Sequence, residues 1–175
     1  MHSTPSDPHT TTGLAQGDLR LLHTPVAQRL LHALVPARLA YTGHDQTPRV
    51  IPINFHWTGD ELVMGAFAGT HKLRALRTRP QVAVCIDTVQ APPEVLLLRG
   101  AVSMTDVDGV LPEYAAAQRR VMGDGATAYL AAIDKPGLRM ARLGLRPTWV
   151  GVLDFQHRFP GRTPPPVLAA LTQTH

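Results

Sequence analysis

The feature that most constrains the fold is a series of short β-rich segments joined by connections of only a few residues. The first three segments are residues 38–42, 49–57 and 61–65. The connections between them contain turn-forming residues such as Gly43, Pro48 and Gly59. Parallel neighbours in a sheet need a dozen or more residues between them. These segments therefore predict an antiparallel meander and argue against a crossover fold.

Later segments complete the pattern of a small barrel with helices around it. Apolar residues at helical spacing predict helices over residues 25–35, 70–79 and 112–122. Runs rich in β-branched residues predict further strands over residues 81–87, 95–105 and 149–155. At 175 residues the chain has the length of one domain with its own core. The order of elements predicts a mainly β (β+α) fold, an antiparallel barrel with peripheral helices.

Both ends of the chain differ in composition from the middle. Residues 1–17 are rich in Ser, Thr, Pro and His and show no apolar periodicity, which predicts a flexible N-terminal arm. Near the other end, Thr163 and the three prolines after it favour an extended polyproline segment in a tail over residues 161–175. Residues 18–160 are then the folded domain.

Charge and composition favour an anionic ligand. Lys and Arg total 17 against 13 Asp and Glu, which gives a net charge of +4. The one local cluster of basic residues is Lys72, Arg74, Arg77 and Arg79. A nucleic-acid surface is the weaker interpretation, because the few aromatic residues are not interleaved with that cluster to form a stacking platform. With 44% hydrophobic and 17% charged residues, the chain falls in the globular class.

The single cysteine and the hydropathy of the chain bear on its compartment. Cys85 lies in an apolar run and has no partner for an intramolecular disulfide, so a reducing compartment is expected. The first residues lack the apolar core of a signal peptide, and no later stretch approaches the length needed to span a bilayer. The sequence therefore predicts a soluble, cytoplasmic protein with no membrane contact.

The start of the basic helix is the first candidate ligand-binding feature. A strand passes through a small-residue loop into the helix at Thr70, His71 and Lys72. Free backbone N–H groups and the positive end of the helix macrodipole make such a start a phosphate site, with Lys72 supplying charge. An N-capped helix whose basic residues are simply solvated explains the same pattern at least as well.

The strand from Arg49 to Phe55 is the second candidate ligand-binding feature. Pro52 removes one ladder hydrogen bond, which indicates an edge or bulged strand. Such a strand can offer free backbone groups to a ligand. A core strand with an edge proline is an equally good account of the same residues.

The chain lacks the familiar signatures of metal binding and nucleophilic catalysis. Its histidines show no tight ligand spacing and Cys85 has no cysteine companion, so no metal site is expected. There is no G-x-S-x-G elbow, no Walker loop and no G-x-G-x-x-G turn between a strand and a helix. Catalytic residues are therefore not assigned from the sequence.

In the order and spacing of these segments the chain resembles the pyridoxamine 5'-phosphate oxidase-like family of flavin-binding split barrels. The matching stretches are residues 37–41, 48–53, 70–84 and 97–102, and the match is strongest over 70–84. The resemblance covers about residues 20–160. It is carried by the order and spacing of the stretches rather than by any single motif.

The resemblance implies an antiparallel split β-barrel that forms a homodimer, with two FMN sites at the subunit interface. It places the phosphate tail at Lys72 and its helix, with Arg49 as a second phosphate contact and Thr70 as a further donor. The flavin ring is then expected along the strand that follows Arg49. The ring-lining residues are Val50, Ile51, Pro52 and Ile53.

Two features depart from the family pattern. Where the oxidase proper has an arginine before the lysine, this chain has His71, which carries little charge at neutral pH. The oxidase's C-terminal substrate-binding signature is replaced by the run over residues 146–155. The resemblance therefore does not extend to pyridoxamine phosphate as the substrate.

Together these features predict an FMN-dependent oxidoreductase. In it the cofactor performs hydride transfer, and the protein supplies phosphate binding, ring orientation and a substrate pocket. The runner-up is a reductase that uses the deazaflavin coenzyme, whose long anionic tail suits the basic helix. A non-catalytic module that sequesters flavin is the alternative from another class. A nicotinamide is a candidate electron donor, and the substrate is a small molecule that the sequence does not identify.

Overall fold

The computed structural model describes residues 13–161 and 163–172 of the 175-residue chain. Its strands are β1 (Ala37–Thr42), β2 (Pro48–Ile53), β3 (Phe55–Trp57), β4 (Leu62–Phe67), β5 (Gln81–Asp87), β6 (Val95–Asp108), β7 (Arg139–Leu145) and β8 (Trp149–Leu153). Its helices are the 3-10 helix η1 (Leu19–His23) and the α-helices α1 (Pro25–His32), α2 (His71–Thr78), α3 (Pro112–Met122), α4 (Gly125–Ile133) and α5 (Pro165–Thr172). Within these ranges no helix combines the length and apolar character needed to cross a membrane.

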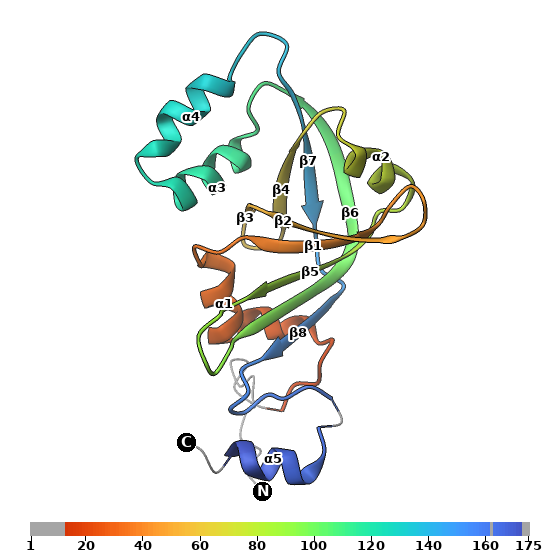
Figure 1. Ribbon diagram of the computed structural model, residues 1–175, viewed down its shortest axis with the longest axis vertical. Helices are drawn as coiled ribbons and strands as arrows, with labels where there is room; N and C mark the ends of the chain where they lie inside the picture. Colours follow the sequence, from red (N-terminus) through yellow and green to blue (C-terminus); the bar gives the residue numbers. More distant parts are fainter. Residues whose placement is uncertain (1–12, 162, 173–175) are drawn as a thin grey trace, which may run out of the picture.

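The strands form a curled antiparallel sheet. Their order is β2-β1-β5-β6-β7-β4-β3, with β8 paired to β6. Only Asn54 separates β2 from β3, although the two strands stand at opposite ends of this order. The sheet must therefore curl until its ends meet, and the strands occupy the middle of the molecule with helices at its periphery (Figure 1). The predicted antiparallel split barrel with peripheral helices is confirmed.

The predicted strand over residues 49–57 is interrupted at Asn54. Its first part, β2, pairs with β1, and its second part, β3, pairs with β4. The predicted meander is thus two hairpins joined at Asn54, because a strand that serves both ends of a curled sheet must change direction. The Asn54 Nδ2 donates to Oε1 of the buried Gln118 in α3 at 2.9 Å. From the same helix, Arg120 Nη2 donates to the carbonyl oxygen of Phe55 at 2.7 Å.

The long strand β6 links the two parts of the barrel. Its first half pairs with β5 and β8, and its second half, from Val102, pairs with β7. Inward-facing side chains of β6 such as Leu96 and Leu98 meet Leu39 and Leu143 in the main core. Burial of these apolar side chains supplies the main free energy that holds the barrel together.

Helix α1 begins as the sequence predicts. The Oγ1 atom of Thr24 accepts a hydrogen bond from the Ala27 N–H at 3.2 Å, and Pro25 occupies the first turn. The helix ends at His32, short of the predicted residue 35, because Ala33 is already extended, with ψ of 156°.

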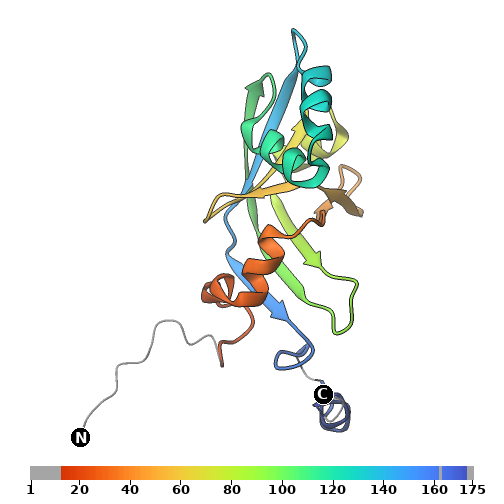
Figure 2. The same ribbon diagram turned by 90° about the vertical axis from the view of Figure 1, so that its left-hand side faces the viewer.

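The sequence does not predict α4 or β7. Helix α4 is apolar nearly all round, so it lacks the one-sided periodicity that marks a surface helix. Strand β7 contains two arginines and Gly144, and most of its residues are buried on both faces, so it lacks the alternation typical of a half-buried strand. In the ribbon views α3 and α4 lie together at one end of the barrel (Figure 2).

The two ends of the chain are only partly described. Residues 1–12 of the predicted arm lie outside the described residues, whereas the Gln16 side chain exchanges two hydrogen bonds with the backbone of Val152 in β8, of 2.7 and 2.9 Å. In the predicted tail, Pro165 begins α5 rather than continuing an extended segment, because the fixed φ of proline suits a first helical turn. Both views show α5 apart from the barrel.

Candidate functional site

The loop from β4 into α2 shapes the predicted phosphate site. Gly69 has a φ of 80°, a left-handed conformation that favours glycine, and the next residue, Thr70, stands at the N-cap of α2. The Thr70 side chain does not cap the helix. Its Oγ1 atom is buried and has no hydrogen-bond partner among the described residues. A buried hydroxyl without a partner is costly, so this position favours a ligand or water that supplies one.

Lys72 is a half-buried cation in the first turn of α2. Burial lowers the pKa of its ammonium group below the usual value. Within the described part of the chain, no hydrogen bond or ion pair joins this side chain to another residue. On the same helix, by contrast, Arg77 Nη2 contacts both carboxylate oxygens of Asp106, at 2.8 and 2.9 Å. An anion beside Lys72 would stabilise the charge that burial disfavours.

The structure directs His71 toward its own helix. Its Nδ1 atom lies 2.7 Å from Nη2 of Arg74, and the side chain is exposed. Because a guanidinium can only donate, the ring nitrogen accepts, which is possible only for a neutral imidazole. His71 in this arrangement brings no positive charge to the helix start.

Arg49, the predicted second phosphate contact, is held by the β1–β2 turn. Its guanidinium Nη2 lies 2.6 Å from Asp45 Oδ2, and it also contacts the hydroxyl of Thr47. Hydrogen bonds from the Thr47 hydroxyl and backbone, together with Arg49, lower the pKa of Asp45 to about 2. Exposed ion pairs of this kind contribute little to stability, so an anionic ligand can compete with Asp45 for Arg49.

The predicted ring-lining strand β2 ends the strand order and is an edge strand, as Pro52 indicates. The side chain of Val50 is 64% exposed, and Pro52 is exposed too. Ile51 and Ile53 are partly buried against the main core. The strand thus presents an accessible surface with apolar side chains.

The two halves of the predicted site lie on the same side of the barrel. In both ribbon views the β1–β2 turn lies beside α2 (Figures 1 and 2). Tyr41 of β1 pairs with Arg49, and α2 contacts β1. No hydrogen bond or ion pair joins Arg49 to Lys72 within the described ranges. Thr70, His71 and Lys72 therefore form one group, and Arg49 with the ring-lining residues forms another beside it.

The outer face of β1, β2, β5 and β6 carries an apolar surface. Two shallow cavities, of about 230 and 320 Å³, open on it next to Val50. The apolar residues that line them include Ala40, Val50, Ala83, Cys85 and Leu97, which we call the outer apolar face. Burial raises the pKa of the Cys85 thiol, and the negative charge of Asp87 raises it further.

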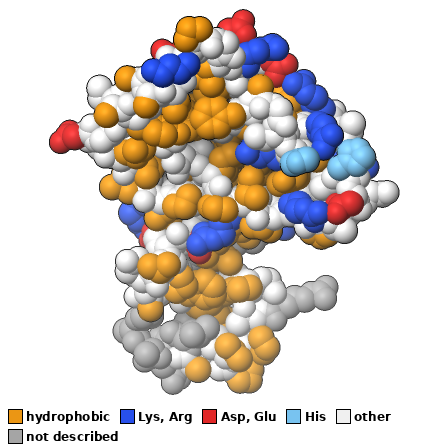
Figure 3. All heavy atoms as spheres, turned by 45° about the horizontal axis from the view of Figure 1, so that its top comes forward, with side chains coloured by type: hydrophobic (Ala, Val, Ile, Leu, Met, Phe, Trp, Pro, Cys, Tyr) orange, Lys and Arg blue, Asp and Glu red, His pale blue; other side chains and the backbone are white. Residues whose placement is uncertain are grey.

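A further cavity of about 250 Å³ lies between α2 and the ends of β6 and β7. It is lined by Ala68, Gly69, Thr70, Leu73, Arg74, Arg77, Asp106, Arg139 and Met140. We call it the arginine cavity. The sequence analysis did not identify it, although residues 70, 73, 74 and 77 have the spacing of one helix face. Arg139 had no such signal, because β7 itself was not predicted. The space-filling view shows Lys and Arg side chains gathered along the right-hand edge of the molecule (Figure 3).

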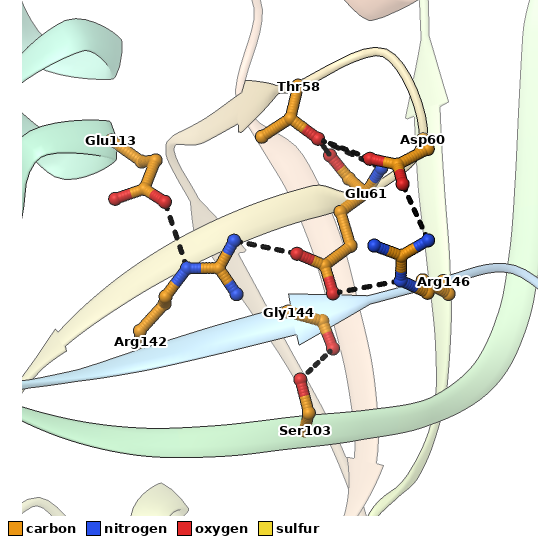
Figure 4. Close-up of polar contacts among 8 residues, drawn as sticks. All are labelled: Thr58, Asp60, Glu61, Ser103, Glu113, Arg142, Gly144 and Arg146. Carbon is orange, nitrogen blue, oxygen red and sulfur yellow. Dashed lines mark hydrogen bonds and ion pairs between the residues drawn. The ribbon is translucent and has the colours of Figure 1, made fainter.

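Where α3 meets the sheet, the charged groups are paired with one another. Arg142 of β7 lies between two carboxylates, with Nη2 at 2.6 Å from Glu61 and Nε at 2.9 Å from Glu113 (Figure 4). Arg146 contacts Asp60 at 2.5 Å and Glu61 at 3.4 Å. Burial by itself would raise the pKa of Glu113, but the hydrogen bond and charge of Arg142 bring it below its usual value. This network joins α3 to the sheet.

No cluster of metal ligands is present in the part of the chain that the structure describes. There, no group of three or more His, Cys, Asp or Glu side chains is placed to hold a metal ion. The candidate site is therefore the basic start of α2 with the exposed strand β2 beside it.

Comparison with solved structures identifies the fold. The chain matches an F420 reductase with a TM-score of 0.56 and 25% identity over 71% of this chain and 94% of that chain. It matches a putative pyridoxamine 5'-phosphate oxidase from Listeria innocua with a TM-score of 0.53 and 16% identity over 73% and 94%. It also matches HutZ, a heme storage protein from Vibrio cholerae, with a TM-score of 0.52 and 16% identity over 74% and 92%. No protein-family model and no curated protein sequence matches the chain.

The fold and the site define a split-barrel protein with a basic helix beside an exposed edge strand. The chain has the fold of the pyridoxamine 5'-phosphate oxidase-like split-barrel family, which confirms the resemblance seen in the sequence. Solved structures with this fold include proteins named for deazaflavin reduction and for heme storage. The fold alone therefore does not determine the ligand.

Proposed function

We propose that this chain is an FMN-binding oxidoreductase of the pyridoxamine 5'-phosphate oxidase-like type. The observation that carries the proposal is Lys72, a half-buried cation without a described partner at the start of α2. A charge in that state gains most from a phosphate, because the anion offsets its desolvation and accepts a charge-assisted hydrogen bond. The fold shared with a putative pyridoxamine 5'-phosphate oxidase supports a flavin phosphate as this ligand.

The residues at the site fit such a cofactor. Lys72 and the backbone N–H groups of the first turn of α2 would hold the phosphate, with Thr70 contributing through its backbone rather than its side chain. Arg49 would also contact the phosphate, which would replace Asp45 as the partner of its guanidinium. His71 would remain a neutral hydrogen-bonding neighbour. The ring would lie along the exposed surface of β2, over Val50 to Ile53. When bound, FMN supplies the hydride-transfer chemistry that the side chains lack.

The proposal includes a homodimer with the cofactor at the subunit interface. Among the residues that the structure describes, no strand pairs with the outer edge of β2, and Val50 is 64% exposed. Unpaired strand edges and contiguous apolar surface are typical of sites that another chain covers. A second copy seated on the outer apolar face would bury Val50 and enclose the ring of the cofactor.

The deazaflavin coenzyme is the second candidate cofactor. The match to an F420 reductase has the highest identity among the three structures compared above, at 25%. The basic residues of α2 suit a cofactor with a longer anionic tail than that of FMN. Titration of the purified protein with each cofactor separates the two candidates.

The test of phosphate placement is a pair of lysine variants. The chain has only one other lysine, Lys135, which is exposed between α4 and β7. Lys72→Ala removes a charge-assisted hydrogen bond and is expected to weaken FMN binding by roughly tenfold or more. Lys135→Ala is expected to leave binding unchanged. Equal FMN affinity in wild type and Lys72→Ala, measured by quenching of flavin fluorescence, would show that the phosphate lies elsewhere.

The second test asks whether the bound cofactor reacts. A nicotinamide donor added to the FMN-loaded protein should bleach the flavin absorbance if the protein is an oxidoreductase. Binding of FMN without reduction by NADH or NADPH, and without reaction of prereduced cofactor with acceptors, would instead support a flavin-sequestering module.

A further inference from the structure

The arginine cavity lies on the face of α2 opposite Lys72. Thr70, Leu73, Arg74 and Arg77 line the cavity and recur at the spacing of one helix face. Lys72 stands two positions before Arg74, which places it on the other side of the helix, and it is not among the cavity-lining residues. The two sets of cations on α2 therefore face different spaces.

The cavity carries an excess of positive charge. Three guanidinium groups line it, those of Arg74, Arg77 and Arg139. Two carboxylates oppose them, Asp106 in the lining and Asp108, which pairs with Arg139 from outside it. Arg74 contacts the neutral ring of His71 and has no carboxylate partner among the described residues. The other two form exposed ion pairs, which are weak enough for a bound anion to replace them.

The rest of the lining fits the same kind of ligand. Thr70, whose buried hydroxyl has no partner within the described ranges, forms part of the wall beside Arg74. The buried side chains of Leu73 and Met140 also line the cavity and exclude water from part of it. Guanidinium groups bind oxyanions through paired N–H donors, and a hydroxyl adds one more donor. With about 250 Å³, the cavity has room for a phosphate or a carboxylate-bearing group.

We propose that the arginine cavity is a second oxyanion site, which binds a phosphate or carboxylate through Arg74, Arg77, Arg139 and the Thr70 hydroxyl. The oxyanion belongs either to a separate small molecule or to a second anionic group on the cofactor held at Lys72. The site stands on its own residues and does not require that FMN is the cofactor.

The test uses inorganic phosphate as the probe and the cofactor-free full chain as the protein. At constant ionic strength, replacing chloride by phosphate is expected to raise the unfolding temperature of the wild type, because a ligand that binds only the folded state stabilises it. Arg74→Gln is expected to weaken the apparent phosphate affinity by roughly tenfold. Asp106→Asn is expected to strengthen it, because the carboxylate that competes for Arg77 is removed. A gain of affinity in Asp106→Asn is not a result that misfolding produces.

Two control variants keep this site apart from the proposed FMN site. Arg29→Gln, which changes an exposed arginine of α1 outside the cavity, should keep the phosphate response of the wild type. Lys72→Ala should lose only the part of the response that comes from the empty FMN phosphate site and keep the part that depends on Arg74. If Arg74→Gln responds to phosphate like the wild type, or if Lys72→Ala alone abolishes the response, the second site is wrong. A wild-type phosphate response in Arg74→Gln would not bear on the proposed FMN site. Likewise, FMN binding that is lost, or not lost, in Lys72→Ala would not bear on the second site.

Cofactor titrations then identify the source of the oxyanion. If Arg74→Gln weakens binding of the deazaflavin coenzyme but not of FMN, the second anionic group belongs to the cofactor. If phosphate still stabilises the cofactor-saturated wild type and not the saturated Arg74→Gln variant, the site takes a separate small oxyanion. Either result supports the site. Phosphate effects of equal size in all variants would instead show that phosphate acts by general ion screening and that the second site is wrong.

Discussion

Two parts of this barrel differ in whether their charged and polar side chains have partners inside the chain. Where α3 covers the sheet, Arg142 is only 23% exposed and contacts two carboxylates, of which Glu61 is 14% exposed. Beside α2, Lys72 and the buried hydroxyl of Thr70 have no partners within the described residues. We call these parts the braced half and the open half.

The contrast separates the groups that hold the fold from the groups that are available to a ligand. Arg142 and its two carboxylates compensate one another inside the chain, so they fix α3 against β7. For Lys72 and the Thr70 hydroxyl in the open half, compensation has to come from outside the described residues, whether from solvent, from a ligand or from a second copy. Mutations in the braced half should therefore lower stability, and mutations in the open half should change binding with little effect on stability.

The largest effect is expected from Arg142→Ala. This change leaves Glu61 and Glu113 close together without the cation that compensates them. The free energy of unfolding is expected to fall by about 3 kcal/mol, because two partly buried carboxylates lose the cation between them. Chemical denaturation monitored by tryptophan fluorescence measures it.

Arg146→Ala is the matched control for that prediction. Arg146 contacts the same Glu61, but its own side chain is 68% exposed. Its loss should cost less than about 1 kcal/mol. Equal destabilisation by the two variants would show that burial does not distinguish the two arginines, and the comparison of the two halves would lose its basis.

Gly144→Ala tests how tightly the braced half is packed. A Cβ at Gly144 would lie 2.6 Å from Arg142 Nη1 and 2.9 Å from Ser103 Oγ. The Arg142 guanidinium is held through Nε and Nη2 by Glu113 and Glu61, and Ser103 Oγ donates to the Gly144 carbonyl oxygen. The change should therefore cost about 2 kcal/mol, typical of overpacking. Gly125→Ala, at the start of α4 with no atom within 4 Å of its Cβ, should leave stability unchanged or slightly higher. If Gly144→Ala left the free energy of unfolding unchanged, the side chains of Arg142 and Ser103 would be free to move aside.

The sequence predicts most of the barrel but not the elements that complete the braced half. Strand β5 and helix α3 have the predicted bounds, because proline precedes or begins each of them and their apolar patterns are clear. Strand β7 is missed because its arginines read as polar interruptions, although Arg142 is compensated by carboxylates distant in sequence. Pairing between residues 81 positions apart, as for Arg142 and Glu61, leaves no local pattern.

At the candidate site, the sequence finds the positions but not their partners. The run from Thr70 to Lys72 and the strand from Arg49 follow from local pattern and from the family resemblance. That Arg49 is bound to Asp45 follows only from the fold of the turn. The arginine cavity needs α2 and β7 to be adjacent, and a chain whose β7 is not predicted cannot show it.

A smaller effect on stability is expected when the open half is changed at Val50. Lysine is common on edge strands, and Val50 is already 64% exposed, so Val50→Lys should change the free energy of unfolding by less than about 0.5 kcal/mol. The same variant places a charge in the proposed dimer contact and should shift the protein toward monomer. Sedimentation at several concentrations measures this shift. If Val50→Lys dimerises like the wild type, the dimer interface does not include β2. If Val50→Lys loses as much stability as Arg142→Ala, the division into two halves is contradicted.

The smallest effect, and the one most specific to the open half, is the pH dependence of Lys72. Burial lowers its pKa in the folded chain, so between that pKa and the ordinary lysine value of 10.5 the unfolded chain binds more protons than the folded chain. The stability of the cofactor-free protein therefore gains a small contribution as pH rises through this window.

Affinity for FMN should change in the opposite direction, because Lys72 loses the proton that it donates to the phosphate. In Lys72→Arg, which stays charged throughout, the loss of affinity with rising pH should disappear, whereas Lys135→Arg should retain it. A wild-type affinity that stays constant across the window would mean that Lys72 does not contact the phosphate, even if the protein binds FMN.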